Sequence, residues 1–284
     1  MFGGVLILSQ MNTIDDLDVA GKRVLIRADL NVPMHEGLVT DVTRIERTLP
    51  TIRDLQAKGA QVIVISHFGR PMGQYNPEMS LQPVAMALQT SLDQDVLFGA
   101  DCIGTTAMAA IDSANNGEVV VLENLRFHAG EEANDKTFAQ AMADLGDVYV
   151  NDAFSCSHRA HASTEAIVHL LPAAAGRLMN SELQALSGVL NSPERPVAAV
   201  VGGAKISTKM EVLGNLASKV DQLIIGGGMA NTFLFAKGVS VGKSLFEPDM
   251  KGQAQDIMAG ATNAGCEIVL PVDATVAQAF KAGA

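Results

Sequence analysis

The sequence predicts a doubly wound α/β fold, because short apolar runs alternate along it with longer helix-like stretches. The chain has 284 residues, of which 48% are hydrophobic and 18% charged, so it can bury a substantial core. Its short runs are β-branched and nearly unbroken, as in strands that are buried on both faces of a parallel sheet. Four such runs come first: Val24–Ile26, Val62–Ile65, Val119–Leu122 and Val148–Val150.

Helices are predicted between these strands. Residues 44–57 and 81–92 carry apolar side chains at spacings of three and four, which is the helical pattern. A further helix is predicted over 181–190, and the polar, proline-containing segment 191–196 follows it. We therefore expect a domain boundary near 175–195. A second series of strands begins after it, at Val197–Val201, Leu223–Ile225 and Ile268–Leu270.

Composition excludes several classes of protein. The formal net charge of −11 argues against a nucleic-acid binder. No apolar run reaches the roughly 18 residues that a membrane span needs, so no membrane association is expected. Three cysteines without pairing or metal-ligand spacing favour the reducing cytoplasm and predict no metal site. The start, MFGGVLILSQ, reads poorly as a signal peptide, and we expect residues 1–11 to be a disordered extension.

Polar side chains follow four of the predicted strands. In an open parallel sheet, ligands bind beyond the carboxyl ends of the strands, so these side chains should share one rim. Arginine suits a phosphate or carboxylate because its guanidinium makes two-pronged contacts. Eight of the ten arginines lie before residue 160, which favours a site for a small polyanion. The candidate residues are Asp29, Asn31, Arg44, His67, Phe68, Gly69, Arg70, Arg126 and Arg159.

Each arginine also has a plainer interpretation. Surface ion pairs are common and contribute only about 0–1 kcal/mol, so a single arginine is as well explained by such a pair as by a ligand. Arg126 has Glu123 or Glu131 as possible partners, and Arg159 has Asp152. The coincidence of four arginines with the ends of strands and the starts of helices is what favours a ligand site.

The second half contains two glycine turns. Gly202 and Gly203 follow a predicted strand, and Lys205 and Lys209 come next, one helical turn apart at an expected helix start. Glycine lets the backbone approach a phosphate, and lysine supplies a mobile positive charge. The second turn is residues 226–228. Neither turn matches GxxxxGK[ST] or GxGxxG, so both are equally compatible with simple strand-to-helix turns, and a nicotinamide dehydrogenase is disfavoured.

Taken together, these motifs resemble the phosphoglycerate kinase family, in its bacterial form. The resemblance runs from about residue 12 to residue 275, in the family's order. It rests on KRVLIRADLNVPM, TDVTRI, SHFGRPMG, ENLRFHAGEE, LGDVYVNDAF, HRAHAST, VGGAKISTK, VDQLIIGGGMANTF and VGKSL. The resemblance implies two Rossmann-like domains, with 12–175 binding 3-phosphoglycerate, 176–192 a linking helix and hinge, and 193–284 part of a nucleotide-binding domain.

The resemblance also implies a reaction: reversible phosphoryl transfer between 1,3-bisphosphoglycerate and ADP. It makes the polar rim the 3-phosphoglycerate site, with Arg27 supporting it from beneath. Arg44 and Lys205 would meet the transferring group, and nucleotide ligands would be Gly202, Gly203, Lys205, Lys209, Gly227 and Gly228. Mg2+ would arrive with ADP or ATP. A cytoplasmic monomer that closes about its hinge is expected.

The sequence departs from the family in two places. Ser155-Cys156-Ser157 stands where the family often has glycine, threonine and alanine, and we expect this loop variation to be harmless. The family's later NGPxGVFE and GGGD[ST] stretches are absent from the 284 residues. An alternative is therefore open at this point: a non-catalytic fragment that binds 3-phosphoglycerate.

Overall fold

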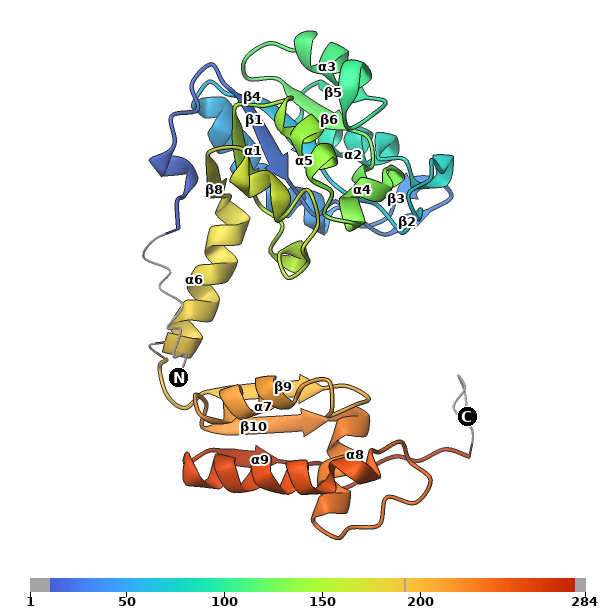
Figure 1. The fold of residues 1–284 in the computed structure, drawn as a ribbon, viewed down its shortest axis with the longest axis vertical. Coiled ribbons are helices and arrows are strands. Elements are labelled where there is room, and N and C mark those ends of the chain that lie inside the picture. The colour runs from blue at the N-terminus through green and yellow to red at the C-terminus, as the bar shows by residue number, and fades with distance from the viewer. Residues whose placement is uncertain (1–10, 192, 279–284) are drawn as a thin grey trace. The chain divides into compact units, whose positions relative to one another are not determined.

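The structure is a computed structural model that describes residues 11–191 and 193–278 (Figure 1). The chain divides into two compact units, Met1–Ala185 and Leu186–Ala284, and each is described by itself. Both units contain parallel sheets with helices, so the predicted α/β class is confirmed.

The first unit is built on a six-stranded parallel sheet in the order β5-β6-β4-β1-β7-β8. β1 is central, since Val24 is in register with Val62 of β4 on one side and with Val148 of β7 on the other. The strands are β1 (Arg23–Arg27), β4 (Gln61–Ile65), β5 (Val96–Gly99), β6 (Val119–Leu122), β7 (Val148–Asn151) and β8 (Ala173–Ala175).

Two apolar clusters cover the two faces of this sheet. Val24 and Ile26 belong to one cluster and Leu25 to the other, because successive side chains of a strand point to opposite faces. Both faces of the sheet are buried, which explains why the strand sequences are apolar without interruption. The helices of this unit are α1 (Thr43–Ala57), α2 (Gln82–Leu92), α3 (Gly104–Asp112), α4 (Ala129–Glu132) and α5 (Lys136–Ala143), and β2 (Met34–His35) pairs antiparallel with β3 (Leu38–Val39).

Helix α6 (Arg177–Asn191) begins four residues before the predicted start at Ser181. The reason is a contact distant in sequence. The Asp152 carboxylate oxygen Oδ1 accepts hydrogen bonds from the backbone N–H groups of Leu178 at 2.9 Å and Met179 at 3.2 Å. These N–H groups of the first turn have no partner within the helix, so Asp152 allows the helix to begin earlier.

The second unit contains a three-stranded parallel sheet in the order β11-β10-β9. Leu223, Ile225 and Phe233 are buried in its core. Its elements are β9 (Ala198–Gly202), α7 (Met210–Ala217), β10 (Gln222–Gly226), α8 (Gly227–Ala236), α9 (Lys251–Asn263) and β11 (Glu267–Val269). Within the described parts of both units, no helix combines the length and apolar character of a membrane span.

Candidate functional site

The polar rim of the first unit follows the four adjacent strands β6, β4, β1 and β7. Asp29 comes two residues after β1, His67 two residues after β4, and Arg126 four residues after β6. Leu125 N–H donates to the Ser66 carbonyl at 3.1 Å, and Ala28 N–H donates to the Ile65 carbonyl at 3.1 Å. These bonds hold the segments after the strands beside one another, so the shared edge predicted from the sequence exists.

Asp29 joins two elements at this rim. Its Oδ2 atom is ion-paired with Nη1 of Arg44, in the first turn of α1, and accepts a hydrogen bond of 2.5 Å from Oγ of Ser155. Burial by itself would raise the pKa of Asp29, but the Ser155 hydroxyl, the Arg44 guanidinium and the Asn31 N–H outweigh it and lower the pKa. Asp29 is therefore ionised at neutral pH.

A cavity of about 310 Å3 opens beside this pair. Asp29, Arg44 and Ser155 line it together with the first turns of α1 and α6. Its remaining lining residues are Thr43, Arg47, Asp152, Ala153, Phe154, Leu178 and Glu182. Arg44 and Arg47 offer guanidinium groups to a small anion here, against the carboxyl groups of Asp29, Asp152 and Glu182 in the same lining.

His67 is only 5% exposed, and Arg27, only 1% exposed, lies directly behind it. Nη2 of Arg27 is 3.1 Å from Nδ1 of His67. Burial, then the positive charges of Arg27 and Arg126, lower the pKa of His67 to about 3, with a smaller effect from Arg159 in the same direction. His67 is therefore neutral, and four basic side chains share one small region.

A buried polar chain holds Arg27 in turn. Nε of Arg27 donates to Oγ of Ser163 at 2.8 Å, and that hydroxyl donates to Oε1 of Glu131 at 2.6 Å. Glu131 is fully buried, and its Oε2 also accepts the Ser163 N–H at 3.0 Å. The negative charge of Glu131 thus accompanies the buried guanidinium, as a buried charge requires.

Arg126 is only 5% exposed and fixes the turn after β4. Its Nη1 atom donates to the Gly69 carbonyl at 2.8 Å, and its Nε atom lies 3.1 Å from Oε1 of Glu132. Neither of the two possible partners named from the sequence pairs with Arg126: Glu131 binds Ser163, and Glu123 accepts hydrogen bonds from the Ser80 hydroxyl and the Leu81 N–H.

The other candidate residues of the rim differ in their contacts. Oδ1 of Asn31 accepts the Gly69 N–H at 2.9 Å, and the Phe68 N–H donates to Oδ1 of Asn124 at 3.1 Å. Arg159 is half-buried, and its Nε lies 3.4 Å from Nε2 of His158; it does not pair with Asp152, which caps α6.

Arg70 is exposed and makes no hydrogen bond or ion pair with any residue that the structure describes. It is thus the one arginine of the candidate set whose guanidinium makes no hydrogen bond or ion pair within the described chain.

The two glycine turns of the second unit lie side by side. Gly202 and Gly226 are in register at the ends of β9 and β10, and the Met229 N–H donates to the Gly203 carbonyl at 2.9 Å. Gly227 has φ +66°, and a Cβ atom there would lie 3.0 Å from the Gly203 oxygen. Gly228 is nearly as confined, 3.2 Å from the Ala204 oxygen. Close approach of two backbones explains these glycines without any ligand.

The two lysines lie before the helix and not in its first turn. Helix α7 begins at Met210, and Lys209 is its N-cap residue. Nζ of Lys209 donates to the Gly202 carbonyl at 2.8 Å, whereas Lys205 is exposed. The expected helix start at Lys205 was wrong, because the backbone turns first through residues 206–209, where Lys209 N–H donates to the Ile206 carbonyl. The Lys209 ammonium group therefore lies beside the glycine turn.

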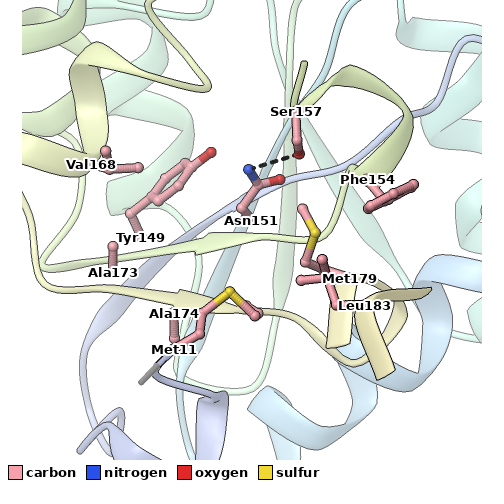
Figure 2. A pocket seen from close by; sticks show the side chains of 11 residues that line it. Met11, Tyr149, Asn151, Phe154, Ser157, Val168, Ala173, Ala174, Met179 and Leu183 are labelled. Carbon is pink, nitrogen blue, oxygen red and sulfur yellow. Dashed lines mark hydrogen bonds between the residues drawn. The ribbon is translucent and has the colours of Figure 1, made fainter. Parts of the chain in front are cut away.

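A second cavity of the first unit, about 330 Å3, differs sharply in character (Figure 2). Its side chains are apolar apart from Asn151 and Ser157, which are hydrogen-bonded to each other at 3.4 Å, and Tyr149, whose hydroxyl donates to the Ser163 carbonyl at 2.7 Å. Met11, placed here at the cavity edge, falls in the segment expected to be disordered; residues 1–10 lie outside the described residues. This cavity offers no charge to a polyanion.

Comparison with known proteins identifies the family. The family model for phosphoglycerate kinase matches residues 14–284. A phosphoglycerate kinase of Ruegeria sp. (strain TM1040) is 61% identical over 272 residues, covering 96% of this chain and 69% of that protein. One of Rhizobium meliloti (strain 1021) is 61% identical over 273 residues, covering 96% and 68%. The chain belongs to the phosphoglycerate kinase family.

Solved structures agree with this assignment. Phosphoglycerate kinase from Coxiella burnetii superposes with a TM-score of 0.81 at 43% identity, over 92% of this chain and 66% of that one. The enzyme from Pyrococcus horikoshii OT3 gives a TM-score of 0.78 at 32% identity, over 92% and 67%. The chain thus spans about two thirds of the length of the relatives that it matches.

Sequence reasoning missed several residues of the rim. Ser155 was dismissed as a harmless variation, yet its hydroxyl binds Asp29. Asn124 was not singled out, although its side chain bonds to the backbone of both Phe68 and Arg126. No local pattern reveals Glu131 and Ser163 as partners, because they are 32 residues apart.

Proposed function

We propose that the first unit binds 3-phosphoglycerate on its arginine rim. The observation that carries the proposal is the gathering of Arg27, Arg126 and Arg159 around the buried, neutral His67, with Arg44 nearby on Asp29. A ligand with one carboxylate, one hydroxyl and one phosphate suits this set. Guanidinium groups bind both anionic ends, and Asp29 and Asn31 can bond to the hydroxyl.

We further propose that the family's reaction, reversible phosphoryl transfer between 1,3-bisphosphoglycerate and ADP, is the activity that these residues serve. Such a transfer needs positioning and charge neutralisation more than covalent chemistry. Arg44 and Lys205 would each supply positive charge to the transferring group. Lys209 and the glycines at 202, 203, 227 and 228 would bind the nucleotide. Mg2+ would be carried in by ADP or ATP, and we assign it no side chain.

The alternative of a binding protein without turnover has its own support. The first unit contains the whole candidate acid-binding rim, whereas phosphoryl transfer would also require Lys205 and the glycine turns of the second unit. Binding of 3-phosphoglycerate therefore needs fewer assumptions than catalysis. A coupled assay for ATP-dependent phosphorylation of 3-phosphoglycerate, with calorimetric binding of each ligand, separates the two functions.

The binding claim is best tested on Arg70, because its guanidinium makes no hydrogen bond or ion pair within the described chain. Arg70→Ala should weaken 3-phosphoglycerate binding about tenfold or more, since a charge-assisted hydrogen bond contributes roughly 1.5–3 kcal/mol. Arg53→Ala is the matched control, an exposed arginine of α1 that donates to the Ser91 carbonyl at 3.4 Å. Equal affinities for both variants and the parent chain would reject the rim as the binding site.

A further inference from the structure

Two groups in the first unit each bring one aspartate, one histidine and one cysteine together. The described residues place the possible ligand atoms of Asp29, His67 and Cys156 within 4.8 Å of one another, and likewise those of Asp101, Cys102 and His128. Ligand atoms around one tetrahedral zinc ion, at about 2.0–2.3 Å from the metal, lie roughly 3.3–3.8 Å apart. Small side-chain rotations would therefore bring either group to the spacing of a single ion, although nothing in the sequence spacing indicated either.

The group on the arginine rim is unsuited to a cation. Arg27 donates to Nδ1 of His67, so the proton of the neutral ring is on Nε2 and neither nitrogen offers a free lone pair. Asp29 is already ion-paired with Arg44. The nearby guanidinium groups would repel a metal ion.

The second group lies elsewhere in the fold. Asp101 and Cys102 belong to the loop between β5 and α3, and His128 is the N-cap residue of α4. Oδ1 of Asp101 lies 2.7 Å from Nε2 of His128 and accepts the Cys102 N–H at 2.6 Å. The His128 ring also packs 5.2 Å from the ring of Phe138, centroid to centroid. Two contacts therefore orient the imidazole before any ion binds.

Charge distinguishes this group from the first. The carboxylates of Asp101, Glu131 and Glu123 lie near the Cys102 thiol, whereas arginines surround the group on the rim. Negative charge near a site favours a bound cation. Cys102 itself is fully buried, but the side chains of His128 and Asp101 are 32% and 39% exposed, so an ion can enter from their side.

We propose that Asp101, Cys102 and His128 form a binding site for one divalent cation of the zinc class. Sulfur, nitrogen and oxygen ligands in one site favour a borderline-soft ion over Mg2+ or Ca2+. Binding replaces the thiol proton by the metal, so one proton leaves from Cys102. The imidazole proton that Nε2 of His128 donates to Asp101 moves to Nδ1, and Nε2 and the Asp101 carboxylate then bind the metal. A fourth position is left for water. The site is separate from the arginine rim and does not depend on the proposed function.

The experiment is a Co2+ titration of the full chain, followed by absorption. Cobalt bound to a thiolate gives a sulfur-to-metal charge-transfer band, and Zn2+ then displaces it at the same site. We expect one Co2+ per chain, with the band lost in Cys102→Ser and retained in Cys156→Ser. Asp101→Asn and His128→Gln keep the buried thiol and should lower the affinity by at least about tenfold, since even outer partners of metal ligands cost that much.

Circular dichroism of each variant shows that it is folded before the titration is interpreted. Loss of the band in Cys156→Ser with retention in Cys102→Ser would assign the metal to the rim and overturn the proposal. Absence of any thiolate band in the parent chain would overturn it as well. If Cys102→Ser does not fold, unchanged affinity in both Asp101→Asn and His128→Gln is the contradicting result.

Discussion

Nη2 of Arg27 lies 3.1 Å from Nδ1 of His67, and both side chains are almost fully buried. A guanidinium can only donate hydrogen bonds, so Nδ1 must accept and the proton of the neutral imidazole is on Nε2. Glu131 and Ser163 hold Arg27 in place, and through Arg27 they determine which nitrogen of His67 carries the proton. A neutral N–H donor can bond to an anionic ligand without adding charge.

The first prediction follows from the pKa of His67, which burial and the neighbouring arginines lower to about 3. By nitrogen NMR, His67 should stay neutral, with its proton on Nε2, from pH 8 down to about pH 5. Between the unfolded pKa of about 6.5 and the folded value, the unfolded chain binds the extra proton, so His67 lowers the stability as the pH falls through this window. A His67 signal that titrates near pH 6.5 would contradict the assignment.

The second prediction concerns the paired glycine turns. Gly227→Ala should destabilise the second unit by about 1–3 kcal/mol, because a Cβ at φ +66° is strained and lies 3.0 Å from the Gly203 oxygen. Gly214→Ala is the matched control, since Gly214 lies inside α7 with no atom within 4 Å of an added Cβ. It should stabilise the unit by about 0.5–1 kcal/mol. Urea unfolding of both variants measures the contrast, and equal effects would reject the confinement of Gly227.

A third prediction tests Asp152 as the cap of α6. Asp152→Ala removes the acceptor of the Leu178 and Met179 N–H groups and should cost about 1–2 kcal/mol of unfolding free energy. Asp152→Asn retains a side-chain oxygen and should lose less. Hydrogen exchange at Leu178 and Met179 gives a local measurement, and protection that survives in Asp152→Ala would show that the helix start does not depend on the carboxylate.

These cases show what the sequence could and could not reveal. The four central strands could be predicted because both faces of the sheet are buried. Every residue of Val119–Leu122, for example, is apolar. Strand β8 was missed because it is three alanines at the edge of the sheet, with neither β-branched side chains nor alternation. The rim could be predicted because the carboxyl ends of parallel strands lie at the same edge of a sheet, so the residues that follow them are neighbours. Pairings such as Arg126 with Glu132 depend on which carboxylates are already occupied, and only the fold decides that.

The last prediction concerns Ser155, whose hydroxyl donates to Oδ2 of Asp29 at 2.5 Å. Burial opposes ionisation of Asp29, and the Ser155 hydroxyl is the largest of the effects that nevertheless lower its pKa. Ser155→Ala should therefore raise the pKa of Asp29, measured by carboxyl carbon NMR, while Ser155→Thr keeps a hydroxyl and should change it less.

The lowered pKa of Asp29 stabilises the fold at pH values above the unfolded pKa near 3.8, and this contribution is lost as the pH falls through the folded pKa. Ser155→Ala should thus unfold more easily at neutral pH and differ less from the parent chain in acid. An unchanged Asp29 pKa would show that Arg44 and the Asn31 N–H keep this carboxylate ionised without the Ser155 hydroxyl, and that the loop variation is harmless at this residue.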